Sequence, residues 1–257
     1  MNKTSTTAQP TLVLLHGWGV NQAVWQSTKA AMVDGINVIT LDLPGFGDER
    51  QFPQPYQLSQ VIEQLADKIP EQSYVYGWSL GGLVAIALAK QYPNKVKQLG
   101  LIAASPCFLR QPDWPGMAEP VMQQFAVALS KNLSLTIERF LAIQALGSAS
   151  AKADIKALKQ AILAYPEPEP AAISGALALL STTDLRPTLQ QLSMPIVGCF
   201  GRLDSLVPIA MLPSLLQLNK TIQLTTLAES SHAPFISHPD AFITWLKASI
   251  FTAAATD

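Results

Sequence analysis

Short, mainly apolar segments of strand length alternate along the chain with longer stretches in which apolar residues recur at helical spacing. The strand-length segments are 11–15, 37–42, 73–76, 98–104, 195–201 and 221–227. A continuous apolar run such as 11–15 is typical of a parallel strand that is buried on both faces. Helical spacing occurs over 24–33, 58–69, 83–90 and 240–251. This alternation predicts an α/β fold with a mostly parallel central sheet and helices on both of its faces.

The alternation of strand and helix is interrupted between about residue 106 and residue 186. No strong strand pattern occurs there, and proline clusters separate four helical stretches, 118–129, 133–144, 151–164 and 171–180. An all-helical insertion between two α/β halves is typical of a lid over a site. We therefore predict an α/β core formed by 11–106 and 187–257, a helical lid at 107–186, and a flexible tail at 1–10.

The sequence Gly77-Trp78-Ser79-Leu80-Gly81-Gly82 lies where the third predicted strand ends and a helix begins. A turn this tight admits only small side chains at Gly77 and Gly81, and it raises the hydroxyl of Ser79 above the sheet. The N-terminus of the following helix adds partial positive charge where an oxyanion would form. The G-x-S-x-G spacing alone is common, but between a strand and a helix it indicates the nucleophile elbow of the α/β-hydrolase fold.

A serine hydroxyl becomes a strong nucleophile only when a base removes its proton and a third group orients that base. The chain has three histidines, His16, His232 and His238. His232 lies in the loop after the last predicted strand, where hydrolases with the chain order serine, acid, histidine carry their base. We therefore predict that His232 is the base. We expect His16 to be a structural part of its loop, and His238 to be a surface or helix-capping residue.

The acid is expected after the strand that follows the lid, where Asp204 is the carboxylate in the right place. Asp204 would accept the Nδ1 proton of His232 and stabilise the imidazolium that forms. Asp184, at the end of the lid, and Asp240, at the start of the last helix, are the alternatives.

The oxyanion hole requires two backbone N–H groups. We expect one from Leu80, which follows the serine, and one from Trp18, in the loop after the first strand. The rings of Trp18 and Trp78 flank this place, so we expect both to line the pocket; the alternative is that they are core aromatics.

Composition narrows the classes of function. Hydrophobic residues make up 49% of the chain, charged residues 14%, and the net charge is −1, so the protein is globular and has no basic excess for nucleic acid or an anionic membrane. The polar N-terminus lacks the apolar core of a signal peptide, and no apolar run reaches the roughly 18 residues of a membrane span, so we expect a cytoplasmic protein. We expect Cys107 and Cys199 to be packing residues and not a disulfide.

The sequence contains no motif for a metal site or for nucleotide binding. The histidines and cysteines do not cluster at metal-ligand spacing, and the glycine-rich segment lacks the lysine of a phosphate-binding loop and the spacing of a dinucleotide fingerprint. We therefore expect no metal and no cofactor.

Several segments carry a resemblance to a known family. They are His16-Gly17-Trp18-Gly19, 42–47 (DLPGFG), 77–82 (GWSLGG), 105–108 (SPCF), 114–116 (WPG), 138–144 (ERFLAIQ) and 232–239 (HAPFISHP). The chain resembles the pimeloyl-[acyl-carrier protein] methyl ester esterases of biotin synthesis, members of the α/β-hydrolase superfamily, over nearly its whole length from Thr11. The resemblance implies a serine carboxylesterase that hydrolyses the methyl ester of a pimeloyl chain on acyl carrier protein.

The resemblance also implies which residues touch the substrate. Trp18, Ser79, Leu80 and His232 would contact the ester. An acyl channel under the lid would be lined by Phe140, Leu141, Ala142, Ile143 and Gln144. The family usually has more chain before its first core strand, which leaves open whether the first edge strands of the sheet are present here.

The lid has a basic balance. From 131 to 159 it holds five basic residues (Lys131, Arg139, Lys152, Lys156, Lys159) and two acidic ones (Glu138, Asp154), a local charge of +3. Lys152, Lys156 and Lys159 are spaced i, i+4 and i+7 and therefore share a helix face. Acyl carrier proteins are strongly acidic, so this face, together with Arg139, is a candidate docking surface. The alternative is an ordinary solvated helix face.

Two further functions remain as alternatives. The first is a general short-chain carboxylesterase or carbon–carbon bond hydrolase with no carrier partner. The second is a hydrolase fold that serves as a non-catalytic ligand-binding module, although such proteins commonly lose a triad member and all three are present here. We expect a monomer whose partner is acyl carrier protein, with no nucleic-acid and no membrane partner.

Overall fold

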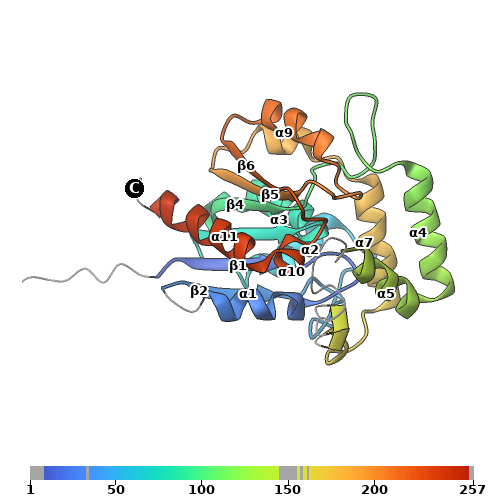
Figure 1. Cartoon of the computed structure of the whole chain (residues 1–257). Coiled ribbons are helices and arrows are strands. Elements are labelled where there is room, and N and C mark those ends of the chain that lie inside the picture. Colours follow the sequence, from blue (N-terminus) through green and yellow to red (C-terminus); the bar gives the residue numbers. More distant parts are fainter. Residues whose placement is uncertain (1–8, 33–34, 145–154, 157–158, 161, 255–257) are drawn as a thin grey trace, which may run out of the picture.

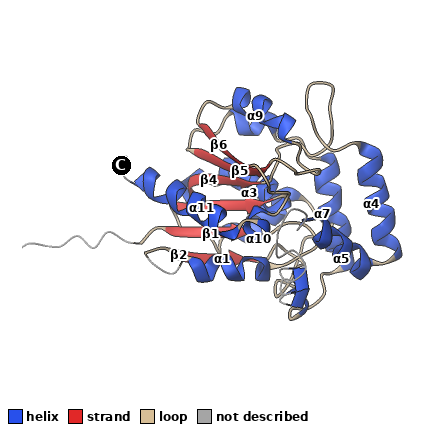
Figure 2. Cartoon of the chain, in the orientation of Figure 1, coloured by secondary structure: helices blue, strands red, loops and turns tan. Residues whose placement is uncertain are grey.

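A single parallel sheet forms the centre of the computed structural model, which describes residues 9–32, 35–144, 155–156, 159–160 and 162–254. Its strands are β1 (Thr11–Leu15), β2 (Asn37–Leu41), β3 (Ser73–Trp78), β4 (Val96–Ile102), β5 (Ile196–Gly201) and β6 (Ile222–Leu227). Their order across the sheet is β2-β1-β3-β4-β5-β6, and every neighbouring pair is parallel (Figure 2). The predicted α/β fold with a parallel central sheet is confirmed.

Helices cover both faces of this sheet (Figure 1). One face carries α2 (Leu58–Ala66), α3 (Leu80–Gln91), α8 (Arg186–Gln190) and α9 (Leu212–Leu218). The other carries α1 (Gln26–Ala31), α10 (Pro234–Ser237) and α11 (Pro239–Ala254). Short 3-10 turns occur at Gln22–Trp25, Pro93–Lys95 and Ile209–Met211.

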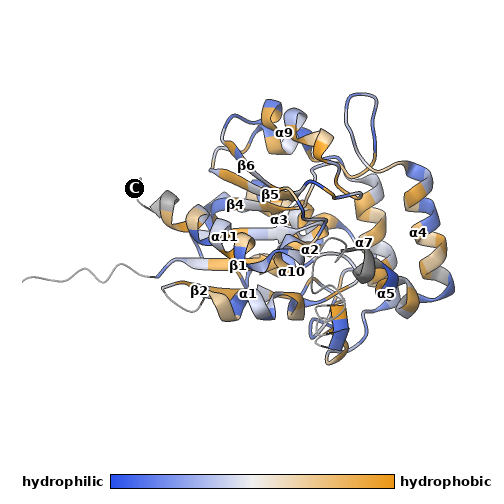
Figure 3. Ribbon diagram, in the orientation of Figure 1, coloured by the Kyte–Doolittle hydropathy of each residue, from blue (hydrophilic) through white to orange (hydrophobic). Residues whose placement is uncertain are grey.

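The inner strands are mainly apolar because successive side chains enter two different cores. In β1, Val13 and Leu15 pack under α2 and α3, while Leu12 and Leu14 pack under α1 and α11. All four are fully buried. Alternate side chains of a strand point to opposite faces, so a strand covered on both sides needs an unbroken apolar run. Figure 3 shows the inner strands as mostly hydrophobic.

Between β4 and β5 the chain leaves the sheet and forms α4 (Glu119–Lys131), α5 (Leu133–Gln144) and α7 (Pro170–Thr182). These helices gather at the end of the sheet where the strands finish (Figure 1). We call residues 107–186 the helical segment. Most of the helix expected at 151–164 lies outside the described residues. The division into core and lid stays a prediction.

Several polar contacts join the helical segment to the sheet domain. The Glu169 N–H donates to the Gly45 carbonyl at 3.0 Å, and Arg50 forms an ion pair with the Glu169 carboxylate. The Asn21 side chain donates to the Ile162 carbonyl at 3.0 Å. These bonds lie in the second half of the helical segment, which is therefore fixed to the loops after β1 and β2.

Both cysteines are free and buried, as expected. Burial raises the pKa of Cys199 to about 12, so its thiol stays protonated and unreactive at neutral pH. In the part of the chain that the structure describes, no helix has the length and apolar character to cross a membrane.

Candidate active site

Ser79 lies in a strained turn between the end of β3 and the first residue of α3. Its φ of 54° and ψ of −117° fall in a region that residues other than glycine rarely adopt. Hydrogen bonds hold the turn: the Ser79 N–H donates to the Ile102 carbonyl at 3.0 Å, and the Gly82 N–H donates to the Ser79 carbonyl at 2.9 Å. Strain of this kind persists only where the surroundings enforce it, and it is typical of functional sites.

The glycines of the turn are required by close backbone packing. A Cβ atom at Gly77 would lie 2.2 Å from the backbone of Gly81. A Cβ at Gly81 would lie 2.6 Å from the carbonyl oxygens of Leu15 and His16. No side chain fits at these distances, so the turn has the tightness expected from the sequence.

Asp204 and His232 form a buried pair at the same end of the sheet. The carboxylate Oδ2 of Asp204 lies 2.8 Å from Nδ1 of His232, and the two residues are only 6% and 1% exposed. The other oxygen, Oδ1, accepts the N–H groups of Leu206 and Val207 at 2.8 and 2.9 Å. These bonds fix the carboxylate, and the carboxylate fixes the orientation of the imidazole.

The loops after β3, β5 and β6 carry Ser79, Asp204 and His232. Carboxyl ends of parallel strands meet at one edge of a sheet, which is why three residues distant in sequence share this region. The two alternative acids lie elsewhere: Asp184 forms an ion pair with Arg186, and Asp240 is an exposed residue in the first turn of α11.

Trp78 links the serine turn to the histidine loop. Its indole N–H donates to the His232 carbonyl at 2.8 Å, and the two ring centroids are 5.7 Å apart. Trp78 is fully buried in the core between the sheet and α11. The expectation that its ring lines the pocket was wrong: Trp78 faces the core under α10 and α11, and the pocket at Ser79 is lined by other residues, so the alternative of a core aromatic holds.

Trp18 occupies the position expected of a pocket residue. Its ring borders the same pocket as Ser79, and it packs against Phe125 of α4 with the centroids 5.0 Å apart. Its indole N–H donates to the Ile173 carbonyl of α7 at 3.1 Å. Trp18 thus joins the loop after β1 to two helices of the helical segment.

An apolar pocket of about 450 Å³, counting its open side, lies at Ser79. We call it the acyl pocket. Ser79 is its one polar lining residue; the others come from the loops (Trp18, Phe108, Met117, Leu206), α4 (Val121, Met122, Phe125) and α7 (Leu177, Leu180). Sequence reasoning missed the residues from α4 and α7. Their apolar helical spacing was the only signal, and it does not distinguish a pocket wall from a core.

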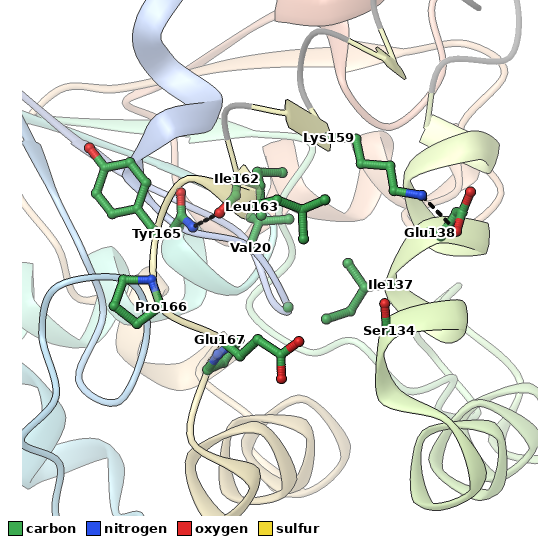
Figure 4. A pocket seen from close by; sticks show the side chains of 13 residues that line it. Val20, Ser134, Ile137, Glu138, Lys159, Ile162, Leu163, Tyr165, Pro166 and Glu167 are labelled. Carbon is green, nitrogen blue, oxygen red and sulfur yellow. Dashed lines mark hydrogen bonds and ion pairs between the residues drawn. The ribbon is translucent and has the colours of Figure 1, made fainter.

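A second pocket, which we call the side pocket, is lined by the residues that directly follow Trp18 in the same loop. It has about 590 Å³ of empty space and lies between Gly19–Asn21, α5 and residues 159–168 (Figure 4). Val20, Ile137 and Ile162 form apolar walls, whereas Ser134, Glu167 and the Glu138–Lys159 ion pair are polar. The side pocket is therefore amphipathic, unlike the acyl pocket.

The residues expected to bind the substrate or the carrier protein fall into three groups: exposed, paired with an acidic side chain, or outside the described part of the structure. Arg139 and Lys156 are exposed, whereas the Lys159 ammonium lies 2.8 Å from a Glu138 carboxylate oxygen. Lys152 lies outside the described residues. The residues Phe140, Leu141, Ala142, Ile143 and Gln144 belong to α5, but their side chains are outside the described part of the structure.

The other two histidines lie apart from the Asp204–His232 pair. His16 is completely buried between the Gly17 carbonyl and the Leu43 N–H, and this burial lowers its pKa. His238 is the half-buried C-terminal cap of α10. Among the described residues, no group of three histidine, cysteine or acidic side chains could hold a metal ion.

Residues 10–239 match the family model described as alpha/beta hydrolase fold. The chain is 48% identical over 236 residues to the pimeloyl-[acyl-carrier protein] methyl ester esterase of Pseudoalteromonas atlantica, covering 91% of this chain and 92% of that protein. It is 45% identical over 235 residues to the enzyme of the same name from Aeromonas hydrophila, with 91% and 92% covered. An esterase from Exiguobacterium antarcticum has a similar fold, with a TM-score of 0.84, 17% identity, and 94% of this chain and 91% of that one covered.

Proposed function

The chain belongs to the α/β-hydrolase family and, within it, to the pimeloyl-[acyl-carrier protein] methyl ester esterases, and on this basis we propose that Ser79, His232 and Asp204 form its catalytic triad. The protein is a carboxylic ester hydrolase that converts the methyl ester of pimeloyl-[acyl-carrier protein] to pimeloyl-[acyl-carrier protein] and methanol, in biotin synthesis. The observation that carries the triad is the buried Asp204–His232 pair at 2.8 Å, on loops beside the strained turn of Ser79.

In the first half of the reaction, the Ser79 hydroxyl attacks the ester carbonyl carbon while Nε2 of His232 takes the hydroxyl proton. The backbone N–H groups of Leu80 and Trp18 stabilise the oxyanion that forms on the carbonyl oxygen. The tetrahedral intermediate collapses by breaking the bond to the methoxy oxygen. That oxygen takes the proton from His232 and leaves as methanol, and the acyl group remains on Ser79.

In the second half, a water molecule attacks the acyl-enzyme and gives its proton to Nε2 of His232. Collapse of the second tetrahedral intermediate returns that proton to Ser79 and releases the free carboxylate. Throughout, Asp204 accepts the Nδ1 proton of His232 in a hydrogen bond and stabilises the imidazolium without itself becoming protonated.

We propose that the helical segment is the lid and that the two pockets divide the substrate. The acyl pocket beside Ser79 suits methylene groups of the pimeloyl chain, because its other lining residues are apolar. The side pocket suits the more polar, carrier-side part of the substrate, because it combines apolar walls with polar groups and begins at Gly19, directly after Trp18. Phe140–Gln144 follow Ile137 on α5 and would continue the channel.

The carrier protein docks, in this proposal, on the exposed basic residues of the lid. Arg139 and Lys156 are exposed to solvent. Leu135, one helical turn before Arg139, is 41% exposed and adds an apolar residue to the same surface. Lys159 lines the side pocket, where the Glu138 carboxylate pairs with its ammonium, so it adds less positive charge to this surface than Arg139 and Lys156 do. Lys152 stays a predicted member of this surface. Positive charge of either residue type attracts an acidic carrier over several ångströms. A lysine adds charge to the surface but cannot form the two parallel hydrogen bonds that an arginine forms with a carboxylate or phosphate.

The direct test compares hydrolysis of the pimeloyl methyl ester on acyl carrier protein with hydrolysis of the same ester without the carrier, at several salt concentrations. We expect a strong preference for the carrier-bound ester that fades as salt screens the charges. Equal rates at every salt concentration would instead indicate a general carboxylesterase without a carrier partner.

The triad is tested separately with Ser79→Ala, for which we expect kcat to fall by about a millionfold while the unfolding temperature is kept. Retained turnover in this variant would contradict the mechanism. A fluorophosphonate probe should label Ser79 in the wild type, and absence of labelling would indicate a binding module.

A further inference from the structure

The loop after β1 places a buried histidine against the backbone that the mechanism uses. Nδ1 of His16 lies 2.7 Å from the Gly17 carbonyl oxygen, and the Leu43 N–H donates to Nε2 of His16 at 2.9 Å. Because Nε2 accepts a hydrogen bond, the ring proton is on Nδ1, and Nδ1–H donates to Gly17. Desolvation lowers the pKa of His16, which agrees with this neutral tautomer.

The carbonyl that His16 binds belongs to the same peptide unit as the Trp18 N–H. A trans peptide unit is planar, and its C=O and N–H point in opposite directions. Among the described residues the cis peptide bond recorded is Gln54–Pro55, so this unit is trans. Holding the Gly17 oxygen toward the imidazole therefore directs the Trp18 N–H away from it.

The peptide also lies against the serine turn. A Cβ at Gly17 would approach the Trp78 ring to 2.9 Å, so the backbone of Gly17 lies directly on that indole. The His16 carbonyl in turn packs against Gly81, at 2.6 Å from the Cβ that residue 81 would carry. The His16 carbonyl belongs to the preceding peptide unit, so the chain is packed on the elbow as far as Gly17, and the bond from His16 holds the Gly17–Trp18 unit that follows.

Glycine makes such a bond necessary. The backbone dihedral angles next to Gly17 are less restricted than those of other residues, so rotation of the Gly17–Trp18 peptide is inexpensive. A rotated peptide would present a carbonyl oxygen where the mechanism needs an N–H donor, and two oxygens carrying negative charge repel each other.

We propose that His16 is a positioning residue: its Nδ1–H bond to the Gly17 carbonyl fixes the peptide whose Trp18 N–H stabilises the oxyanion. This inference rests on the proposed function and deepens it. His16 touches no substrate. It acts through the backbone, and the Leu43 N–H acts one step further away by fixing the tautomer of His16.

Two matched variants test the role of each ring nitrogen. The side-chain amide of His16→Asn reaches the place of Nδ1 and can still donate to Gly17. The amide of His16→Gln reaches the place of Nε2 instead, so the bond to Gly17 is lost. We expect kcat to fall about tenfold to a hundredfold in His16→Gln, with KM changed less than about threefold, and to stay within about threefold of wild type in His16→Asn.

Binding of an oxyanion mimic separates positioning from simple stability. An alkyl trifluoromethyl ketone forms a tetrahedral adduct with the serine, and its inhibition constant should rise in His16→Gln by the same factor by which kcat/KM falls. Equal losses in both variants, or losses that follow the unfolding temperature alone, would overturn the proposal. Ser79→Ala serves as the separate control: if it kept its activity, the proposed mechanism itself would fail, whatever the His16 variants show.

Discussion

At the scale of single residues, hydrogen bonds hold the side chains of the site in fixed orientations. Asp204 is the clearest case, since one carboxylate oxygen accepts two backbone N–H groups and the other faces His232. The carboxylate is thus both held in place by its own loop and directed at the imidazole. Its chemistry and its position are set by different oxygens.

Replacement of this carboxylate gives a sharp prediction. In Asp204→Asn the loop can keep its bonds to Oδ1, but the group facing His232 no longer stabilises an imidazolium, so kcat should fall by about 10⁴ with the fold intact. Asp184→Asn is the matched control, because Asp184 is paired with Arg186 away from His232. Steady-state kinetics on both variants decides; a similar small loss in each would exclude Asp204 as the acid.

Burial of His16 predicts an acid-sensitive contribution to stability. Desolvation lowers the folded pKa of His16, while the nearest carboxylate, Asp42 at 3.7 Å, opposes that shift. The unfolded chain therefore takes up the proton first, and stability is lost as pH falls below the ordinary value of about 6.5, by at most about 1.4 kcal/mol per pH unit. His16→Asn should reduce this loss. Urea unfolding between about pH 7.5 and about pH 5.5 measures it, and parallel profiles for the two proteins would refute it.

At the scale of elements, the turn between β3 and α3 is the most constrained part of the molecule. Gly77→Ala would place a methyl group 2.2 Å from the backbone of Gly81, so β3 and α3 would have to move apart. We expect a loss of more than about 4 kcal/mol in the free energy of unfolding. It would be measured as a much lower midpoint of unfolding, or the variant would be recovered only as insoluble protein.

The control for this prediction is Gly35→Ala. Gly35 has a φ of +80° but no atom within 4 Å of the added Cβ, so the expected cost is only the roughly 1–2 kcal/mol of left-handed backbone. Gly77 itself has no positive φ, so similar losses at the two positions would contradict the large cost assigned to the close packing of the elbow.

The helices α4 and α7 determine the acyl pocket. Leu177→Trp should fill part of it and raise KM for the pimeloyl ester about tenfold, while the rate on methyl acetate stays within about threefold because a short acyl group does not need that space. Leu216→Trp, on the exposed side of α9, is the matched control and should change neither. If the long and the short ester were affected alike, the pocket would not hold the acyl chain.

At the scale of the whole molecule, the basic excess is local: residues 131–159 carry a charge of +3, although the net charge of the whole chain is −1. The exposed Arg139 and Lys156 lie on the helical segment, at the end of the sheet that holds the site. Electrostatic guidance of an acidic carrier depends on this placement and not on the total charge.

A double variant tests that placement. Arg139→Glu with Lys156→Glu should raise KM for the carrier-bound ester about tenfold or more at low salt and leave the free ester unaffected. Lys29→Glu with Lys220→Glu makes the same change in net charge on exposed residues outside the helical segment. Equal effects of the two pairs would show that only the total charge matters, and no effect of either would remove the docking surface.

Each of the six described strands overlaps a segment predicted from the sequence, because strands of a parallel sheet are short and mainly apolar. The predicted 11–15 is β1 without any shift, and 221–227 differs from β6 by one residue. The helices α8, α9 and α10 were not predicted. They are five, seven and four residues long, too short for a helical period to show, and their packing on the sheet rather than their own propensity holds them.

By itself, the sequence determined the fold, the strained turn at Ser79 and the pair Asp204 and His232, because each depends on local patterns and on chain order. Only the tertiary structure decided which tryptophan faces the pocket, which lysine is neutralised by Glu138, and that His16 binds the carbonyl beside Trp18. Such outcomes depend on partners that folding brings together, such as Trp78 and His232, which are 154 positions apart. A hydrogen bond between distant segments leaves no periodic trace in the sequence, so only the packed chain reveals it.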